Sequence, residues 1–122
     1  MDCAMSKIEI FDIIGAGLKA EAVRQRTIAN NVANLQTPGY HRLDVRFEDL
    51  LAEVLDSSDK DEMQEIQAEI FQPNDTPVNS SGNNVNLEME VGQMVENSLR
   101  HKTYIRLLQK KYQQIDLAIE VK

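Results

Sequence analysis

The stretch that decides the fold is Ala-Asn-Asn-Val-Ala-Asn-Leu-Gln-Thr-Pro-Gly-Tyr, residues 29–40. It closes a long amphipathic segment and then turns the chain sharply. Pro38 disfavours helical backbone at the residue before it, so a helix that arrives from upstream is predicted to end near Gln36. The segment Thr37–Tyr40 fits a type II turn, because Pro38 presets φ at the second position and Gly39 supplies a positive φ at the third.

Three asparagines, Asn30, Asn31 and Asn34, lie at the end of the apolar face that enters this turn. Their amides can bond the carbonyl groups left free at a helix end, or the backbone of a partner segment. Asn is also a common helix terminator, which leaves a purely structural role open. A helix that only packed a core would hardly need three of them, so we expect the turn to have a further role.

Charge and composition narrow the classes of function. The 122 residues include 20 acidic and 13 basic side chains, which gives a net charge of −7. This balance argues against nucleic-acid binding, and three Phe, three Tyr and no Trp leave few rings for stacking on bases. At this length we predict a single domain, residues 1–122, with one modest core.

No secretory or membrane segment is predicted. No window approaches the roughly 18 apolar residues of a membrane span. The N-terminal residues contain an acid, Asp2, and no apolar run ahead of a cleavage site, so they do not resemble a secretory signal peptide. Cys3 is the single cysteine, so we expect neither a disulfide nor a cysteine metal site. A free thiol is the expected state.

Residues 8–36 are predicted to form one long helix. Positions on one face step by three and four throughout, and are Phe11, Ile14, Leu18, Glu21, Gln25, Ile28, Val32 and Leu35. Glu21 and Gln25 interrupt this face in its middle, where polar residues usually cost stability and fix register or partner choice. The basic residues of the segment are expected mostly to face away, and are Lys19, Arg24 and Arg26.

Two glycines weaken the first part of this helix. Gly15 and Gly17 each cost about 1 kcal/mol relative to Ala in a helix interior. They either permit the close approach of another helix, or they mark a weak first part, so that the helix begins firmly only at Leu18. The sequence leaves both interpretations open.

The middle of the chain is predicted to consist of short pieces joined by loop. Residues 37–55 hold the turn, an alternating extended piece and about two turns of helix. Residues 56–85 are predicted to be a variable loop, in which 66–71 forms one short strand or helical turn. The acids of 56–65 lack the offsets and the glycine of a calcium loop, so a solvated linker is expected.

Residues 86–121 are predicted to form a second long helix. Asn86 is a suitable N-cap, and Glu88 and Glu90 are expected to complement the helix dipole as first-turn charges. One face again steps by three and four, and holds Val91, Met94, Ser98, His101, Ile105, Leu108, Tyr112, Ile115 and Ile119. A second side of this helix is also apolar and holds Leu99, Leu107, Leu117 and Val121. A helix face that is exposed to solvent would not normally carry these residues.

These elements predict a mainly α fold, in which two long terminal helices pack as an antiparallel coiled-coil-like hairpin with a short extended and irregular middle region. Two helices with such wide apolar faces cannot bury each other completely. We therefore expect other chains to complete the core, through an assembly seam formed by Phe11, Ile14, Leu18, Ile28, Val32, Leu35, Val91, Met94, Ile105, Leu108, Tyr112, Ile115 and Ile119. The alternative is a self-contained hairpin with some exposed leucines.

Three motifs resemble the N-terminal signature of bacterial flagellar rod and hook proteins. They are residues 11–20 (FDIIGAGLKA), 26–34 (RTIANNVAN) and 37–40 (TPGY). Downstream, residues 82–90 (GNNVNLEME) and 96–101 (ENSLRH) are similar to the proximal rod subunits in particular. Among the proximal rod subunits, FlgC is an alternative assignment. FlgC usually has a longer insertion after the Asn-rich helix, and this insertion is absent here.

This resemblance implies a structural subunit of the proximal rod of the flagellar basal body, and not an enzyme. Such a subunit self-assembles through its terminal helices into a torque-transmitting drive shaft in the periplasm, and is exported by the flagellar type III apparatus without a cleaved signal peptide. The family motif and turn residues are Asn30, Asn31, Asn34, Thr37, Pro38, Gly39 and Tyr40.

The resemblance also implies the partners. They are other rod subunits (copies of this chain and a FlgC-like sister), the adaptor FliE, the MS ring, and the export gate during secretion. No cofactor, metal ion, nucleic acid or small-molecule substrate is implied. Phe47 and Leu51 resemble the short aromatic-x-x-x-aliphatic motif that the gate holds, although any amphipathic turn matches it and ordinary packing of Phe47 explains it equally well.

No active site is predicted. His41 and His101 are the only histidines, and neither lies in a cluster with metal-ligand spacing. Cys3 has no base nearby in sequence, and neither a phosphate loop nor a nucleophile elbow is present. Two rival functions stay open: a helical export chaperone or adaptor, which would form a small closed complex, and a coiled-coil regulator, which would tolerate loss of the Thr37–Tyr40 turn.

Overall fold

The computed structural model describes residues 7–57 and 66–120. The elements in these ranges are α1 (Lys7–Ala33), β1 (Asp44–Arg46), α2 (Glu48–Ser57), β2 (Glu69–Phe71) and α4 (Leu87–Glu120). The expectations for Cys3, for Val121 and for most of the charge run at 56–65 lie outside the described residues.

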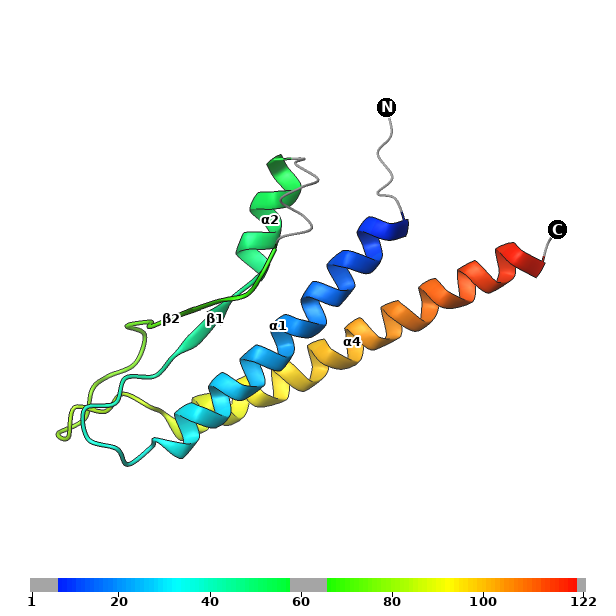
Figure 1. Cartoon of the computed structure of the whole chain (residues 1–122). Coiled ribbons are helices and arrows are strands. Elements are labelled where there is room, and N and C mark those ends of the chain that lie inside the picture. The colour runs from blue at the N-terminus through cyan, green and yellow to red at the C-terminus, as the bar shows by residue number, and fades with distance from the viewer. Residues whose placement is uncertain (1–6, 58–65, 121–122) are drawn as a thin grey trace.

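The two long helices lie side by side and run in opposite directions (Figure 1). The end of α1 and the start of α4 lie at the same end of the molecule, and α4 continues past the start of α1. This arrangement confirms the mainly α fold, with an antiparallel helix hairpin. A short strand region lies between the two long helices in the sequence.

The strands and α2 form an arm that lies beside α1 (Figure 1). β1 pairs antiparallel with β2, and Val45 lies opposite Ile70 in the register. The guanidinium of Arg46 lies 4.6 Å from the centre of the Phe71 ring across this pair. The segment 66–71 therefore contains a short strand rather than a helical turn.

The turn after α1 has the geometry expected for its residue types. α1 ends at Ala33, and residues 34–36 continue as hydrogen-bonded turn. Gly39 has a φ of +75°, and the Tyr40 N–H donates to the Thr37 carbonyl at 3.3 Å, as a type II turn requires. Residues with a Cβ rarely adopt this φ, so glycine is needed at position 39.

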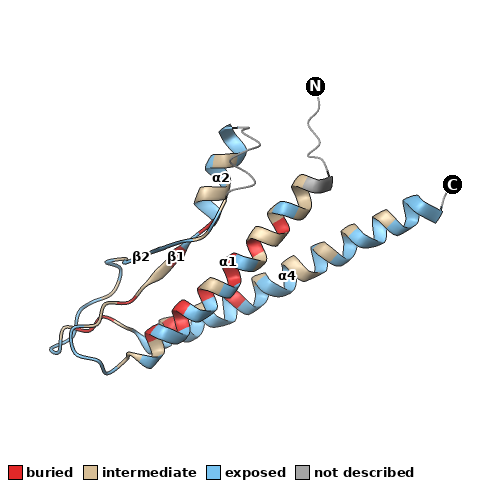
Figure 2. Cartoon of the chain, viewed as in Figure 1, coloured by how far each residue is buried: buried red, intermediate tan, exposed pale blue. Residues whose placement is uncertain are grey.

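α1 buries a mixed face rather than an apolar one (Figure 2). The buried positions step by three and four and are Ile14, Gly17, Ala20, Glu21, Arg24, Thr27, Ile28 and Asn31. The expectation that Arg24 faces away is wrong, since Arg24 is only 7% exposed and pairs with two carboxylates. Lys19 and Arg26 do face outward.

The face of α4 that packs on α1 is shifted from the predicted one. Its buried residues are Glu90 and Asn97, whereas Val91 and Met94 are 48% and 37% exposed. The reason is that buried polar groups need partners, and those of Glu90 lie on the α1 side. Towards the C-terminus the predicted face does meet α1, because the ring of Tyr112 lies 5.3 Å from that of Phe11.

Gly17 permits the close approach of the two helices. A Cβ at residue 17 would overlap the ring of Tyr104, whereas no described atom lies within 4 Å of a Cβ built at Gly15. This decides between the two interpretations for Gly17.

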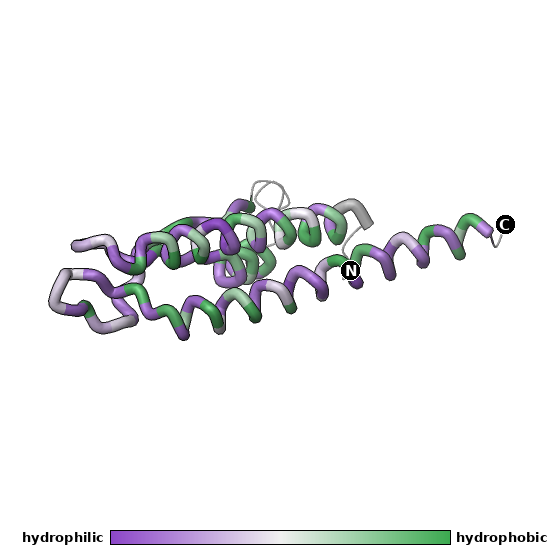
Figure 3. Tube along the Cα trace, turned by 90° about the horizontal axis from the view of Figure 1, so that it is seen from below, coloured by the Kyte–Doolittle hydropathy of each residue, from purple (hydrophilic) through white to green (hydrophobic). Residues whose placement is uncertain are grey.

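Hydrophobic residues recur along the whole of α4, including the part that extends past α1 (Figure 3). Even so, no helix in residues 7–57 and 66–120 is long and apolar enough to cross a membrane.

Candidate functional site

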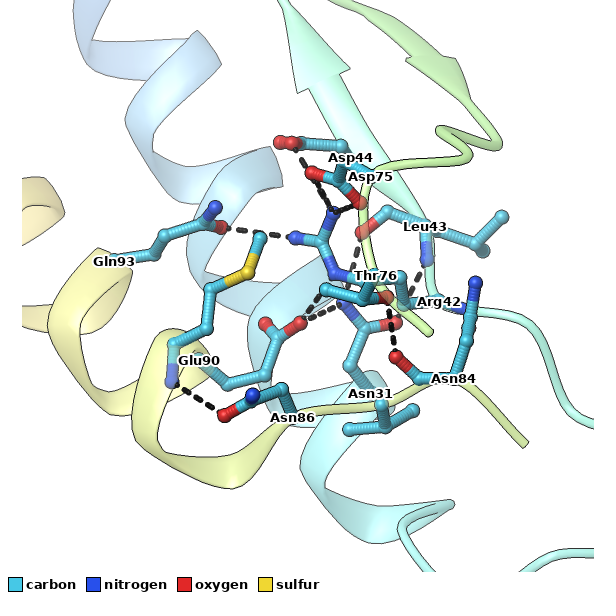
Figure 4. Close-up of polar contacts among 12 residues, drawn as sticks. Asn31, Arg42, Leu43, Asp44, Asp75, Thr76, Asn84, Asn86, Glu90 and Gln93 are labelled. Carbon is cyan, nitrogen blue, oxygen red and sulfur yellow. Dashed lines mark hydrogen bonds and ion pairs between the residues drawn. The ribbon is translucent and has the colours of Figure 1, made fainter. Parts of the chain in front are cut away.

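A cluster of polar side chains lies where the end of α1, the turn, the loop before α4 and the first turns of α4 meet (Figure 4). We call it the polar junction and define it by Asn31, Arg42, Asp75, Asn84, Glu90 and Gln93. Its central residues, Asn31, Arg42 and Glu90, are each 0% exposed. Polar groups at this depth need partners, and the junction supplies them.

Arg42 is the centre of the polar junction. Its Nε donates to Glu90 Oε1 at 2.7 Å, and one terminal nitrogen donates to both carboxylate oxygens of Asp75 at 3.0 Å. The other terminal nitrogen donates to Gln93 Oε1 at 3.2 Å, and the backbone N–H of Arg42 donates to Asn84 Oδ1 at 2.6 Å. One side chain therefore ties the segment after the turn to the loop and to α4.

Asn31 bonds the segment after the turn to the end of α1. Its Nδ2 donates to the Leu43 carbonyl at 2.8 Å, and its Oδ1 accepts the Leu43 N–H at 2.9 Å, as a paired strand would. The same amide donates to Glu90 Oε1 at 3.1 Å and accepts from the Tyr40 hydroxyl at 2.9 Å. Asn31 thus binds a following segment, which is more than helix termination.

The other two motif asparagines serve the turn itself. Asn34 donates to the Asn30 carbonyl at 2.8 Å, which satisfies a carbonyl at the end of α1, and accepts from the Thr37 hydroxyl at 3.1 Å. Asn30 donates to the Tyr40 hydroxyl at 2.9 Å. Burial raises the pKa of Tyr40.

A second set of bonds joins the turn to the loop before α4. Asn83 is 2% exposed and donates to the carbonyls of Asn34 and Thr37, both at 2.9 Å. Gly82 has a φ of +84°, and a Cβ built there would lie 3.3 Å from the Cα of Gly39. The two glycines with positive φ therefore pack against each other.

Farther along the helix pair lies a second set of charges, the helix ion cluster, formed by Glu21, Arg24, Glu48 and Arg100. Arg24 lies 2.7 Å from Glu21 Oε1 and 2.6 Å from Glu48 Oε2. Arg100 of α4 lies 3.7 Å from Glu48 Oε1. The cluster therefore connects α1, the arm and α4.

The two carboxylates of the helix ion cluster have opposite pKa shifts. Burial raises the pKa of Glu21, and the charge of Arg24 offsets this only in part. Burial also disfavours the ionised form of Glu48, but the hydrogen bond from Arg24, a backbone hydrogen bond and the charges of Arg24 and Arg100 together outweigh it and lower the pKa of Glu48. Among the described residues, Glu21 Oε2 finds no hydrogen-bond partner.

The predicted assembly seam is divided between two kinds of surface. Its buried or half-buried members are Phe11, Ile14, Leu18, Ile28, Val32, Leu35, Ile105, Leu108 and Ile115. Its exposed members, all on α4, are Val91, Met94, Tyr112 and Ile119. Of the predicted export-gate motif, Phe47 is 1% exposed and Leu51 is half-buried.

Glu90 is the clearest correction to the sequence interpretation. It was expected to be a first-turn charge, but it is fully buried and bonds Arg42 and Asn31. The sequence does place Glu90, Asn97 and Arg100 on one helical face. A search for apolar residues at helical spacing does not detect such a polar face. Asn86 does act as the N-cap, since its Oδ1 accepts the Met89 N–H at 3.1 Å.

The sequence interpretation gave no individual role to Arg42 and Asn84 of the polar junction, or to Asn83, which joins the turn to the loop. In the described parts of the chain, no group of three His, Cys, Asp or Glu is placed to hold a metal ion. What the arrangement does is hold four segments in one geometry at a single end of the helix pair.

Comparison with known proteins bears on the same region. A family described as "Flagella basal body rod protein" matches residues 12–41, which span most of α1 and the turn. A relative, the flagellar basal body rod protein FlgB of Bacillus subtilis (strain 168), is 27% identical over 103 residues, which cover 74% of this chain and 77% of the relative. These two matches support a FlgB-like flagellar basal body rod protein.

The family match contains Asn31 and the turn and stops one residue before Arg42. Both matches are to rod proteins, and neither name describes a catalytic activity. The FlgB-like resemblance extends well beyond the family match, since it covers most of the chain.

Proposed function

We propose that this rod component is a structural subunit of the proximal rod, which self-assembles through its terminal helices into the torque-transmitting drive shaft. The proposal rests on the polarity of α4. Glu90 and Asn97 are its buried residues, while large apolar side chains are exposed along it: Leu87, Val91, Met94, Val95, Leu99, Leu107, Tyr112, Leu117 and Ile119. Exposed apolar side chains at this density are typical of a surface that other chains cover.

The isolated chain is short of buried apolar surface. The fully buried apolar side chains in the described residues are Ile14, Ala20, Ile28, Val45 and Phe47. A large apolar side chain contributes about 1.5–3 kcal/mol on full burial, and ordering one residue costs roughly 1–2 kcal/mol. Burial of the outer face of α4 by neighbouring subunits would supply stability that the single chain lacks.

A pair of charges on this outer face tests the proposal. Val91→Asp with Val95→Asp places both charges on exposed positions, so the folded monomer should keep its helicity while incorporation into basal bodies is lost. Gln72→Asp with Asn74→Asp adds the same charge at exposed positions of the arm and serves as the control. Normal incorporation of the Val91/Val95 variant would contradict assembly through α4.

We propose that the neighbours in the basal body are further copies of this chain, a FlgC-like sister subunit, the adaptor FliE and the MS ring. The match to FlgB over most of the chain supports a place in the periplasmic rod. An alternative is that the chain is itself a FlgC-like subunit. Crosslinking in purified basal bodies, with FliE and FlgC as the proteins sought, separates these positions.

A helical export chaperone or adaptor is the alternative from another class. It would form a small closed complex, whereas a rod subunit self-associates without closure. Light scattering over a concentration series distinguishes them, because a closed complex reaches a fixed mass and an open assembly continues to grow.

We also propose export in an unfolded state without a cleaved signal peptide. Phe47 is 1% exposed, so a gate could hold Phe47 and Leu51 only while β1 and α2 are unfolded. Leu51→Ala should reduce secretion several-fold, and Leu50→Ala, also half-buried on α2, should not. An equal effect of both substitutions would indicate packing alone.

A further inference from the structure

A groove runs along the outer side of α1, beside the segment that leads into β2. It has a volume of about 840 Å³, and we call it the outer groove. The α1 residues that line it include Gly15, Ala16, Ala22 and the basic Lys19 and Arg26, and the other wall is residues 66–68. Small side chains leave room here, since no described atom lies within 4 Å of a Cβ built at Gly15.

The outer groove is basic in an acidic chain. Lys19 and Arg26 are exposed and lie seven residues apart, which places them on one face about two helical turns from each other. Within the described residues, neither cation forms a hydrogen bond or an ion pair, and Asp12 is the acidic residue of the lining. The chain as a whole has a net charge of −7, so two unpaired cations in one groove are a local exception.

α2 has the complementary charge and an apolar face that is half-buried to exposed. Its acids are Glu48, Asp49, Glu53 and Asp56, and it has no basic residue. Helical stepping places Leu50, Leu51, Val54 and Leu55 on one face. None of the ten residues of α2 is buried, and Leu55 is 38% exposed.

The outer half of α4 is a poorer match to the groove, although it is also apolar and exposed. Residues 102–120 carry four basic residues, Lys102, Arg106, Lys110 and Lys111, against Asp116 and Glu120. Docking this part of α4 in the groove would bring like charges towards Lys19 and Arg26.

We propose that α2 of a second copy of this chain docks in the outer groove. Its leucines would cover Gly15, Ala16 and Ala22, and its acids would pair with Lys19 and Arg26. This contact rests on the proposed self-assembly and names one interface of it. Because the groove and α2 are different surfaces, the contact is head-to-tail. A row of copies then has a free outer groove at one end and a free α2 at the other, as an open assembly requires.

A charge exchange in the full-length chain tests the pairing. Lys19→Glu with Arg26→Glu should weaken self-association by about tenfold or more, because like charges facing each other across an interface suppress pairing. Asp49→Lys with Glu53→Lys should do the same, and the four substitutions together should restore association. Arg106→Glu with Lys110→Glu is the matched control, since it makes the same charge change on α4 and should not be rescued by the α2 substitutions.

Cysteine crosslinking identifies which copy supplies α2. In a Cys3→Ser background, one copy carries Ala22→Cys, which lines the groove, and a second copy carries Val54→Cys on the apolar face of α2. A crosslinked dimer is expected only when the two are mixed. A crosslink within one dilute chain that carries both cysteines would show that α2 closes on its own groove, and would overturn the proposal.

The remaining outcomes separate this contact from the proposed function. If the chain assembles but neither the mixed crosslink nor the charge rescue is seen, the α2 contact is wrong and rod assembly stands. If the unaltered chain does not associate at any concentration, both proposals fail.

Discussion

Arg42 is fully buried with a full positive charge at the centre of the polar junction. Taking a guanidinium out of water is costly, and the carboxylates of Glu90 and Asp75 compensate for it. Glu90 Oε2 has no hydrogen-bond partner among the described residues, so the compensation is incomplete. We infer that this pair selects one arrangement of the four segments more than it adds net stability.

Arg42→Ala leaves Glu90 buried without its cation and should lower the free energy of unfolding by about 3–5 kcal/mol. Arg42→Met combined with Glu90→Leu removes both charges and should recover most of that loss, since apolar replacement of a buried pair is often neutral. Urea unfolding followed by circular dichroism measures both. Equal losses in the two variants would contradict a selective role for the pair.

Glu48 contributes a pH-dependent part of the stability. Its pKa is lowered in the folded chain, because the hydrogen bond from Arg24, a backbone hydrogen bond and the charges of Arg24 and Arg100 together outweigh its burial. Its contribution is therefore present above its ordinary pKa and is lost as pH falls through the lowered value.

Glu48→Gln should lower the free energy of unfolding by about 1 kcal/mol at neutral pH, a modest amount because the side chain is partly exposed. The difference in unfolding free energy from the unaltered chain should vanish in acid. Unfolding measured as a function of pH checks this. Glu53→Gln, at an exposed residue of the same helix that forms no ion pair within the described residues, is the control. A Glu48→Gln effect that persists in acid would place its origin outside the ion pair.

Gly39 is required by its backbone conformation. Gly39→Val places a β-branched side chain at a φ of +75° and should cost on the order of 1–3 kcal/mol. Because the turn redirects the chain into the polar junction, swimming in soft agar should also fall. Unchanged swimming would show that the turn is not an organising element.

At the scale of elements, α1 and α4 are in close contact where Gly17 faces Tyr104. Glycine in a helix interior lowers helix stability, so its presence there indicates that the space is used. The helix ion cluster lies from this contact towards the turn, and Phe11 packs on Tyr112 on the other side of it, nearer the start of α1. Contact between the two helices is therefore part close approach, part ion pair and part ring contact, rather than a uniform apolar seam.

Gly17→Ala should destabilise the pair by about 1–3 kcal/mol through overpacking, although alanine is the better helix former. Gly92→Ala on the exposed side of α4 should instead gain about 1 kcal/mol, since no described atom lies within 4 Å of its Cβ. Thermal unfolding compares the two. Combining Gly17→Ala with Tyr104→Leu should restore stability, and a failure to do so would contradict the close-contact explanation.

At the scale of the whole molecule, the chain is polar where its helices meet near the turn and apolar along the outside of α4. Long helices are marginal unless packing stabilises them. We expect the outer parts of both helices to exchange amide protons rapidly in dilute protein and to become protected on assembly.

Two double variants separate folding from assembly. Leu108→Asp with Ile115→Asp places charges on half-buried residues at the α1 contact and should reduce both helicity and incorporation. Leu107→Asp with Leu117→Asp lies at positions that are 42% and 60% exposed and should keep helicity but block incorporation. Full protection of both helices in dilute protein, with normal assembly of the Leu107/Leu117 variant, would indicate a self-sufficient domain.

Local sequence was enough to predict the features that depend on neighbouring residues. The type II turn follows from Pro38 and Gly39, the start of α4 follows from the Asn86 cap, and the two helices follow from stepping by three and four. These are local effects of backbone preference and side-chain spacing, so the helix hairpin could be predicted before any contact was known.

The tertiary structure alone decided which polar side chains are buried. Glu90 meets Arg42 from 48 positions away and Asn31 from 59, and Arg24 meets Glu48 from 24. The spacing of polar residues within one helix can mark a shared face but does not identify a partner at such separations, and Arg24 and Glu90 were expected to be solvated. Because their partners lie where the helices meet, burying these charges turns Val91 and Met94 of α4 outward, and no apolar pattern within one helix determines that rotation.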